Sequence, residues 1–115
     1  MALPDGPSLR FGEFVLDPQA CALLRGDQPV RLQPKTFDLL HYFLRHPLRV
    51  LDKEELLAAV WPGVVVTDHS LTRAIKDLRR ALQDEAAAPR YIETVARRGY
   101  RFMLQPQALV AAPEE

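Results

Sequence analysis

The sequence predicts an α+β fold in which a small sheet, a core of three helices and a closing β-hairpin follow one another along the chain. Short segments divided by turn residues fill the first third, helical periodicity fills the middle, and a two-residue alternation appears near the end. The chain has 115 residues, of which 48% are hydrophobic, and this suits one domain with a single core.

Four short strands are expected in the N-terminal third, at residues 9–11, 14–17, 22–25 and 30–32. They are separated by Gly12, Asp17-Pro18 and Gly26-Asp27, which are residue types that favour turns. Residues 1–8 are expected to be disordered. Because the strands carry no cluster of reactive side chains, their sheet is expected to be structural.

The first helix is predicted over residues 34–46. Pro34 suits the first helical position, where its missing N–H would have no partner, and Pro47 prevents the helix from continuing. The residues expected to face the core are Phe37, Leu40, Phe43 and Leu44.

The second helix is predicted to begin at Asp52 and to end near Val60-Trp61, ahead of Pro62-Gly63. Asp52 and Glu55 have the spacing of a capping box, in which each side chain accepts a hydrogen bond from the other residue's backbone N–H. Trp61 is expected to belong to the core.

The connection over residues 62–67 contains three consecutive valines, Val64, Val65 and Val66. We expect at least one of them to pack in the core, because isolated apolar residues more often pack than bind a partner. The alternative is that the valines are exposed and form a contact patch.

A third helix, over residues 68–83, is strongly amphipathic, and Thr67 or Asp68 can cap its first turn. Its apolar stripe, spaced for one helical face, consists of Leu71, Ala74, Ile75, Leu78 and Leu82. The opposite face carries cations, short polar groups and a histidine, namely His69, Ser70, Thr72, Arg73, Lys76, Asp77, Arg79 and Arg80. Such a face suits nucleic acid, because cations bind phosphates and short polar groups reach base edges.

A linker over residues 84–90 separates this helix from a predicted hairpin, and Pro89 in the linker prevents the helix from continuing. The hairpin strands are expected at residues 92–95 and 100–102, where alternating residues indicate a half-buried ribbon.

The hairpin turn is predicted at residues 96–99, with Arg97 and Arg98 at its tip. Gly99 is expected to supply the positive φ that a tight hairpin often needs. Two guanidinium groups at such a tip can enter a narrow minor groove or bind phosphates.

The formal net charge of zero conceals an uneven distribution. Residues 67–101 hold eight Lys/Arg and five Asp/Glu, a net charge of +3, whereas residues 1–66 hold seven and eight, and the tail adds two acids. The positive charge therefore falls on the third helix and the hairpin, as expected for a nucleic-acid footprint. Because the excess is modest, we expect weak non-specific binding and a stronger dependence on specific contacts or on dimerisation.

The sequence gives little support to catalysis or metal binding. It has no Ser/His/Asp or Cys/His arrangement with suggestive spacing and no glycine-rich phosphate loop. Cys21 is the only cysteine, and His41 and His46 are not on a common helical face. We expect no enzyme activity, no cofactor and a cytoplasmic location. No membrane contact is expected, since no apolar run approaches the ~20 residues of a membrane-spanning helix.

Several motifs together resemble a known family. Residues 71–82 read L-x-x-x-I-x-x-L-R-x-x-L, followed by Y-I-E-T-V at 91–95 and R-G-Y-R-F at 98–102. Upstream, Q-P-K-T-F-D-L-L at 33–40 resembles the family's first core helix, and residues 50–61 resemble its second. Over roughly residues 9–104 the chain resembles the OmpR/PhoB-type winged-helix DNA-binding domain of bacterial transcription regulators.

The resemblance implies a winged helix-turn-helix with a four-stranded antiparallel N-terminal sheet, a three-helix core and a C-terminal hairpin wing at 9–104. Residues 105–115 would be a linker or tail. The implied function is sequence-specific binding of double-stranded DNA in transcription regulation, with helix 68–83 in the major groove and wing 96–99 at the minor groove. In this family the loop at 62–67 can face RNA polymerase, and head-to-tail homodimers on DNA are common. The family often has Ser or Thr where Gln33 stands, so a weaker cap is expected here.

Within this scheme Arg73, with His69 and Thr72 beside it, is the candidate for base readout. The cations Lys76, Arg79 and Arg80 are expected to be divided between base edges and phosphates. Tyr100 is expected either to donate its hydroxyl to a phosphate or to pack in the core. Asp77 departs from many relatives, which carry a basic residue at this position. It is expected to form an ion pair with Arg73 or Arg80, or to accept a hydrogen bond from a cytosine amino group. The residues expected to bind DNA are His69, Ser70, Thr72, Arg73, Lys76, Arg79, Arg80, Thr94, Arg97, Arg98 and Tyr100.

The alternative function is a winged-helix module that binds a protein without sequence-specific DNA binding. Such a module would be expected to have an apolar or acidic outer face, whereas the predicted face is basic. A module that reads RNA would need aromatic stacking platforms, and the predicted face has none. The domain begins close to Met1, which favours a one-component regulator of the ToxR-like kind over a two-component response regulator. A sensing part, membrane-anchored or intracellular, would then follow Glu115, although a stand-alone protein or an excised fragment fits the sequence equally well.

Overall fold

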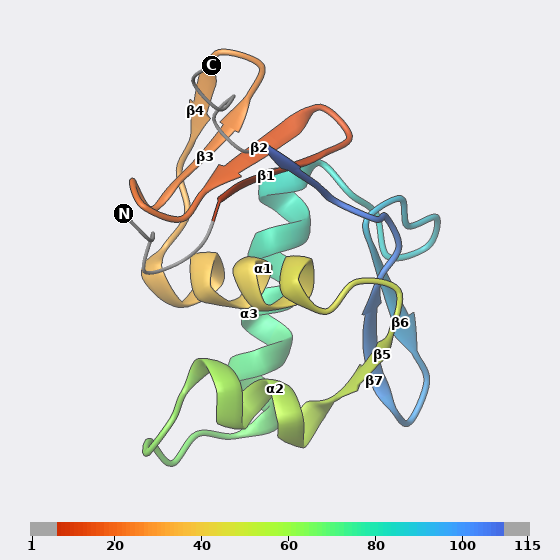
Figure 1. The fold of residues 1–115 in the computed structure, drawn as a ribbon. Helices are drawn as coiled ribbons and strands as arrows, with labels where there is room; N and C mark the ends of the chain where they lie inside the picture. Colours follow the sequence, from red (N-terminus) through yellow and green to blue (C-terminus); the bar gives the residue numbers. More distant parts are fainter. Residues whose placement is uncertain (1–6, 110–115) are drawn as a thin grey trace.

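The structure, a computed structural model, describes residues 7–109. The predicted order of strands, helices and hairpin is confirmed. The elements are β1 (Ser8–Phe11), β2 (Phe14–Asp17), β3 (Ala22–Arg25), β4 (Gln28–Val30), α1 (Pro34–Arg45), β5 (Val50–Asp52), α2 (Lys53–Val60), α3 (Asp68–Leu82), β6 (Ile92–Val95), β7 (Gly99–Phe102) and β8 (Gln107–Leu109). Figure 1 shows the N-terminal sheet at one end of the helical core and the smaller sheet along its side.

The N-terminal sheet has five antiparallel strands in the order β4-β3-β2-β1-β8, one more than expected. Strand β8 pairs with β1 and lies in the stretch predicted to be a linker or tail, so that prediction is corrected for residues 107–109. Its three residues are all exposed and give no alternating pattern in the sequence. Ser8 belongs to β1, which shortens the predicted disordered N-terminus. Residues 1–6 and 110–115 lie outside the described residues.

The fourth strand lies at Gln28–Val30 and not at 30–32 as predicted. The two-residue Gly26-Asp27 turn sets this register, because it places Gln28 directly opposite Arg25. Pro29 is tolerated since β4 is an edge strand.

A second sheet, expected to be a two-stranded hairpin, has three strands in the order β5-β7-β6. The additional strand, β5, pairs with β7 so that Leu51 lies opposite Tyr100. Residues 50–52 were expected to belong with the second helix, and the structure places them before it. The chain therefore passes directly from β5, at the edge of this three-stranded sheet, into α2. We call the β5-β7-β6 sheet the wing sheet.

The helix ends agree in part with the predicted caps. Gln33 makes no side-chain capping bond to α1, as expected. Asp52 Oδ1 accepts from Glu55 N at 2.7 Å, which is half of the predicted capping box. The Glu55 carboxylate instead accepts from the Tyr42 hydroxyl at 2.6 Å and from Arg49 at 2.9 Å. This bond to Glu55 raises the pKa of Tyr42 and ties α2 to α1.

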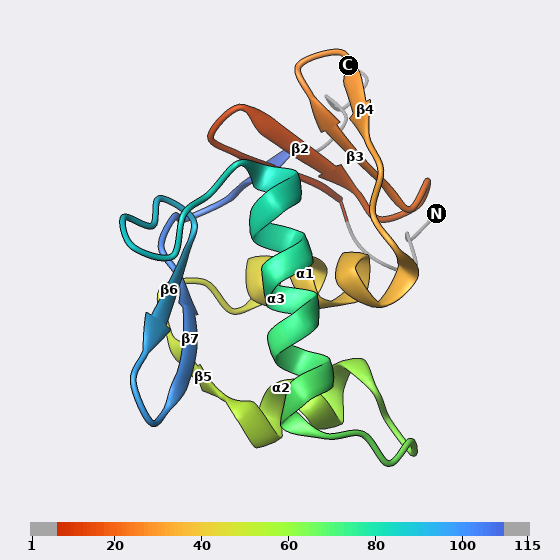
Figure 2. The ribbon, with the colours of Figure 1, turned by 180° about the vertical axis from the view of Figure 1, so that it is seen from behind.

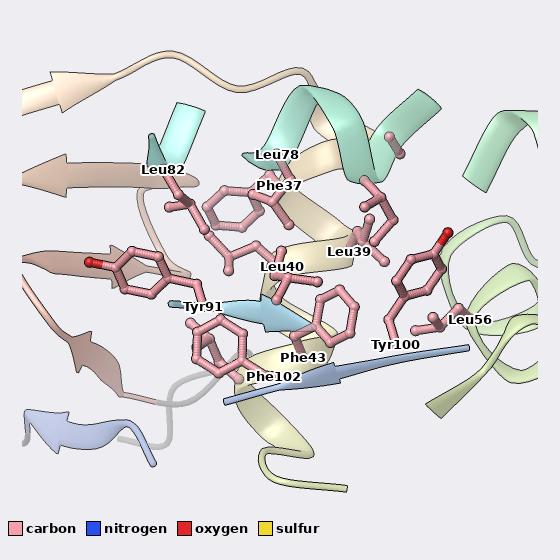
Figure 3. Packing of buried hydrophobic residues seen from close by; sticks show 14 of the residues in the cluster. Phe37, Leu39, Leu40, Phe43, Leu56, Leu78, Leu82, Tyr91, Tyr100 and Phe102 are labelled. Atoms are coloured by element: carbon pink, nitrogen blue, oxygen red, sulfur yellow. The ribbon is translucent and has the colours of Figure 1, made fainter. Parts of the chain in front are cut away.

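The core gathers side chains from all three helices and both sheets (Figure 3). Every residue of the predicted α3 stripe is buried, as are the four residues predicted to face inward from α1. The Phe102 ring lies 5.4 Å from that of Phe11 and 6.2 Å from that of Phe43, measured between centroids. Phe102 therefore joins the wing sheet to the N-terminal sheet and to α1.

The three valines of the α2–α3 loop do not enter the core. Val65 is 101% exposed and Val64 is 56% exposed, while Val66 is only half-buried. The expectation that one of them packs in the core is therefore wrong, and the alternative of exposed valines holds. The nearby core positions are filled by Leu56 and Val60, with Trp61 half-buried against them.

Gly99 is required for a reason other than the predicted one. The positive φ of the hairpin belongs to Arg97, at +66°, and not to Gly99. A Cβ atom on Gly99 would lie 2.0 Å from the carbonyl oxygen of Leu51 in the adjacent strand. Glycine is therefore needed because β5 and β7 approach closely.

We expect Gly99→Ala to lower the free energy of unfolding by about 3 kcal/mol, because the added methyl group forces β5 away from β7. The matched control is Gly26→Ala. Gly26 has a φ of +61°, but an added methyl group would meet no atom within 4 Å, so a cost of about 1 kcal/mol is expected there. Urea unfolding measures both, and equal costs would contradict the close-approach explanation.

Candidate nucleic-acid interface

The outer face of α3 is open along its length. Figure 2 shows α3 on the side of the core that α1 does not cover, with the β6–β7 hairpin beside it. A shallow hollow of about 480 Å³ on this face is lined by His69, Thr72, Arg73, Lys76, Asp77 and Arg80. Six of the side chains that were predicted to lie opposite the apolar stripe are thus brought together. Ser70 is half-buried and lies outside the hollow.

The first turn of α3 is closed by the backbone. Thr67 occupies the capping position, but no side-chain capping bond is made, so the predicted cap is wrong. Ser70 N donates instead to the main-chain oxygen of Thr67 at 3.0 Å. Thr72 Oγ1 donates to Asp68 O at 3.1 Å, which leaves the Thr72 hydroxyl oxygen available as an acceptor.

The charged groups of the hollow have no partners within the part of the chain that the structure describes. Arg73, Lys76 and Arg80 are exposed, and the three ion pairs found among residues 7–109 involve other residues. The predicted pairing of Asp77 with Arg73 or Arg80 is not formed in this structure. These cations are therefore available to a ligand.

Arg79 differs from its neighbours because its guanidinium is engaged within the protein. Its Nη2 donates to Ile92 O and to Thr94 Oγ1, both at 2.8 Å. Its Nε is buried and, among the described residues, has no hydrogen-bond partner. Arg79 therefore braces α3 against β6, and Thr94 takes part in the same contact.

A groove of about 320 Å³ runs between α3 and the wing sheet. Tyr100 lines it but is only 6% exposed, so the core alternative for its ring holds. Lys76 and Arg80 line the same groove, which connects it to the hollow on α3.

The wing carries two exposed arginines at its turn. The turn is closed by Arg98 N, which donates to Val95 O at 3.0 Å. Arg97 and Arg98 are exposed and have no ion-pair partner among the described residues. Arg101, further along the strand, is paired with Glu93 and so is not part of this free positive charge.

The connection between α3 and the wing depends on a residue that the sequence did not single out. The Asp84 carboxylate is buried and accepts from three successive backbone N–H groups, at 2.7 Å from Arg90, 3.2 Å from Tyr91 and 3.0 Å from Ile92. Its sequence signal is weak, since an aspartate after a helix is common and its partners lie six to eight residues away.

Residues 7–109 show neither a metal site nor a membrane-spanning helix. No group of three or more His, Cys, Asp or Glu side chains in this range is arranged to hold a metal ion. None of the helices described is both long enough and apolar enough to cross a membrane.

Sequence comparisons agree with this geometry. Residues 27–102 match the family described as "Transcriptional regulatory protein, C terminal". The chain is 37% identical over 99 residues to the transcriptional activator CadC of Escherichia coli K12, covering 85% of this chain and 19% of CadC. It is 41% identical over 88 residues to the phosphate regulon transcriptional regulatory protein PhoB of Klebsiella pneumoniae, covering 76% of this chain and 38% of PhoB. The chain therefore spans less than half the length of these relatives.

Solved structures match over most of the chain. The DNA-binding domain of E. coli CadC superposes with a TM-score of 0.80 at 35% identity, covering 90% of this chain and 97% of that domain. The Klebsiella pneumoniae RstA DNA-binding domain, crystallised in complex with the RstA box, has a TM-score of 0.75 at 33% identity, covering 84% and 96%. These likenesses confirm the winged-helix fold.

We expect Arg79→Ala to lower the free energy of unfolding by about 2 kcal/mol in the absence of any ligand, because it removes two charge-assisted hydrogen bonds. Arg80→Ala is the matched control, since its side chain is exposed and unpaired among the described residues, and a change within about 0.5 kcal/mol is expected. Urea unfolding of the two variants measures the difference. A stable Arg79→Ala variant would contradict the bracing role.

Proposed function

The chain belongs to the OmpR/PhoB-type family of DNA-binding domains of bacterial transcription regulators, and from this membership we propose that α3 reads the major groove while the wing contacts the adjacent minor groove. One observation carries the proposal. Five exposed cations without protein partners among the described residues, Arg73, Lys76, Arg80, Arg97 and Arg98, lie on α3 and the wing of a chain whose net charge is zero.

The dimensions of α3 suit the major groove. Its 15 residues make a rod about 22 Å long, and the groove admits one α-helix. We assign base readout to Arg73, with His69 and Thr72 beside it, because they lie in the N-terminal half of the exposed face. Lys76 and Arg80 are assigned to phosphates or base edges.

The wing and its supports have separate roles in this proposal. Arg97 and Arg98 contribute positive charge at the minor groove or its phosphates. Arg79 and Thr94 hold the wing in position against α3, so we assign them a positioning role and no direct contact with DNA. Tyr100 and Ser70 are assigned to the margins of the interface because they are largely or partly buried.

The setting of this domain is also a proposal. Because bacterial DNA lies in the cytoplasm, we place this segment there. The family membership supports head-to-tail pairing on tandem half-sites, and pairing would strengthen the modest affinity expected from a small charge excess. The regulators CadC and PhoB are longer than this chain, which covers 19% and 38% of their respective lengths.

The exposed valine loop supports a second contact, with RNA polymerase. Val64, Val65 and Val66 line an apolar hollow of about 380 Å³ together with Leu57 and Trp61 of α2 and its end. Exposed apolar patches of this kind often bind proteins.

Val65→Ser is expected to weaken the retention of polymerase holoenzyme on the promoter-bound domain without changing DNA affinity. The control is Leu48→Asn, which replaces another exposed apolar residue. Unchanged retention by Val65→Ser would exclude this role.

Selection of the 115-residue chain on randomised duplex DNA is expected to enrich one motif, as tandem half-sites about one helical turn apart if the domain pairs.

Arg73→Ala is expected to reduce the binding free energy by about 1–3 kcal/mol and to relax the preference at one position, because a base contact is lost. Arg97→Ala is expected to weaken binding to all sequences and to flatten its salt dependence, because backbone charge neutralisation is lost. Sequencing of the retained DNA and titrations at several salt concentrations measure these effects.

The control for both variants is Arg31→Ala, which removes an exposed arginine outside α3 and the wing. It is expected to leave the motif unchanged. Equal loss on every sequence for Arg73→Ala would contradict its base-reading role. An absence of enrichment by the wild-type chain, even at low salt, would favour the alternative function, a winged-helix module that binds a protein.

A further inference from the structure

A single carboxylate lies among the side chains that line the hollow on α3. Asp77 lines the same hollow as Arg73, Lys76 and Arg80. Its side chain is half-buried, and it makes no ion pair or hydrogen bond with another side chain among residues 7–109. Arg73 and Arg80 stand four residues before it and three after it, where helical neighbours ordinarily pair. The carboxylate is therefore directed to the ligand surface without being neutralised.

A carboxylate at this position is unfavourable for binding phosphates, because like charges repel across the interface. It offers only acceptors, so it needs a hydrogen-bond donor on the DNA. In the major groove the donors are the amino groups of cytosine and adenine, and phosphates supply none. Adenine also presents its N7 acceptor beside the amino group, which disfavours a carboxylate. Cytosine is therefore the base that best matches Asp77.

We propose that Asp77 determines specificity by accepting a hydrogen bond from the exocyclic amino group of a cytosine. The inference rests on the proposed placement of α3 in the major groove. Asp77 is one helical turn from Arg73, about 6 Å along the axis, and base pairs are stacked about 3.4 Å apart. The two side chains would therefore read different base pairs, about two steps apart, in one motif.

The same carboxylate also disfavours wrong sites. Opposite a base edge that presents only acceptors, Asp77 would be left unpaired and repelled. This penalty acts against random DNA, where the modest positive charge of the domain gives little compensation. Asp77 thus increases the difference between specific and non-specific sites.

The test is selection on randomised duplex DNA by the wild-type chain, Asp77→Asn, Asp77→Ala and the control Asp38→Asn. Asp38 is an exposed aspartate on α1, so its replacement removes the same charge away from the interface. The wild type is expected to enrich cytosine at one position. Asp77→Asn is expected to change that position to adenine, whose edge pairs with an amide, and to reverse a preference of about tenfold. Asp77→Ala is expected to reduce the preference there to within about threefold, and Asp38→Asn to leave the motif unchanged.

The outcomes separate this inference from the proposed function. If the wild type enriches a motif that Asp77→Asn and Asp77→Ala leave unchanged, the role of Asp77 is wrong and the proposed function stands. If Asp77→Ala alters only the position that Arg73→Ala alters, Asp77 acts through the arginine and the direct contact is wrong. If the wild type enriches nothing, the proposed function fails and this inference fails with it.

Discussion

The Asp84 carboxylate is the constraint on which the interface depends. Helix α3 ends at Leu82, and residues 85–88 of the segment that follows are exposed and contribute nothing to the core. The wing strand β6 could therefore begin at several registers if nothing fixed its first residues. Asp84 fixes them by accepting from three consecutive N–H groups, two of which belong to the buried residues Tyr91 and Ile92. Without this acceptor those donors would be buried and unpaired, which is costly.

Ile92 is held on both sides by residues of α3 or its end. Its N–H donates to Asp84, and its carbonyl oxygen accepts from Arg79 at 2.8 Å. Because both contacts come from one helix end, the helix and the wing form a single unit, and a shift of one would displace the other. This explains why an arginine with the spacing of a DNA-contacting residue is used within the protein. A rigid pair of reading elements lowers the ordering cost of binding.

Local patterns in the sequence predicted most of the fold, because burial imposes a period on each element. The α3 stripe, the inward residues of α1 and the hairpin all followed from spacing alone. The features that were missed depend on residues distant in sequence. Gly99 is fixed by its approach to Leu51, and β8 is a fully exposed strand that has meaning only beside β1. The outer face of α3 was predictable for the same reason as its buried stripe. The hydrogen bond from Arg79 to Ile92 in the wing could be recognised only from the tertiary structure.

The zero net charge is compatible with DNA binding because the structure determines which charges a ligand meets. Glu93 is paired with Arg101, and Asp84 is buried among N–H groups, so neither acid faces the hollow on α3. The exposed cations of α3 and the wing remain unpaired among the described residues, and Asp77 is the acid in their midst. A surface with few excess charges binds random DNA weakly, since counterion release scales with the phosphates neutralised. Affinity must then come from contacts that only a correct DNA sequence provides. The difference in affinity between specific and random DNA is therefore larger than it would be with a stronger positive field.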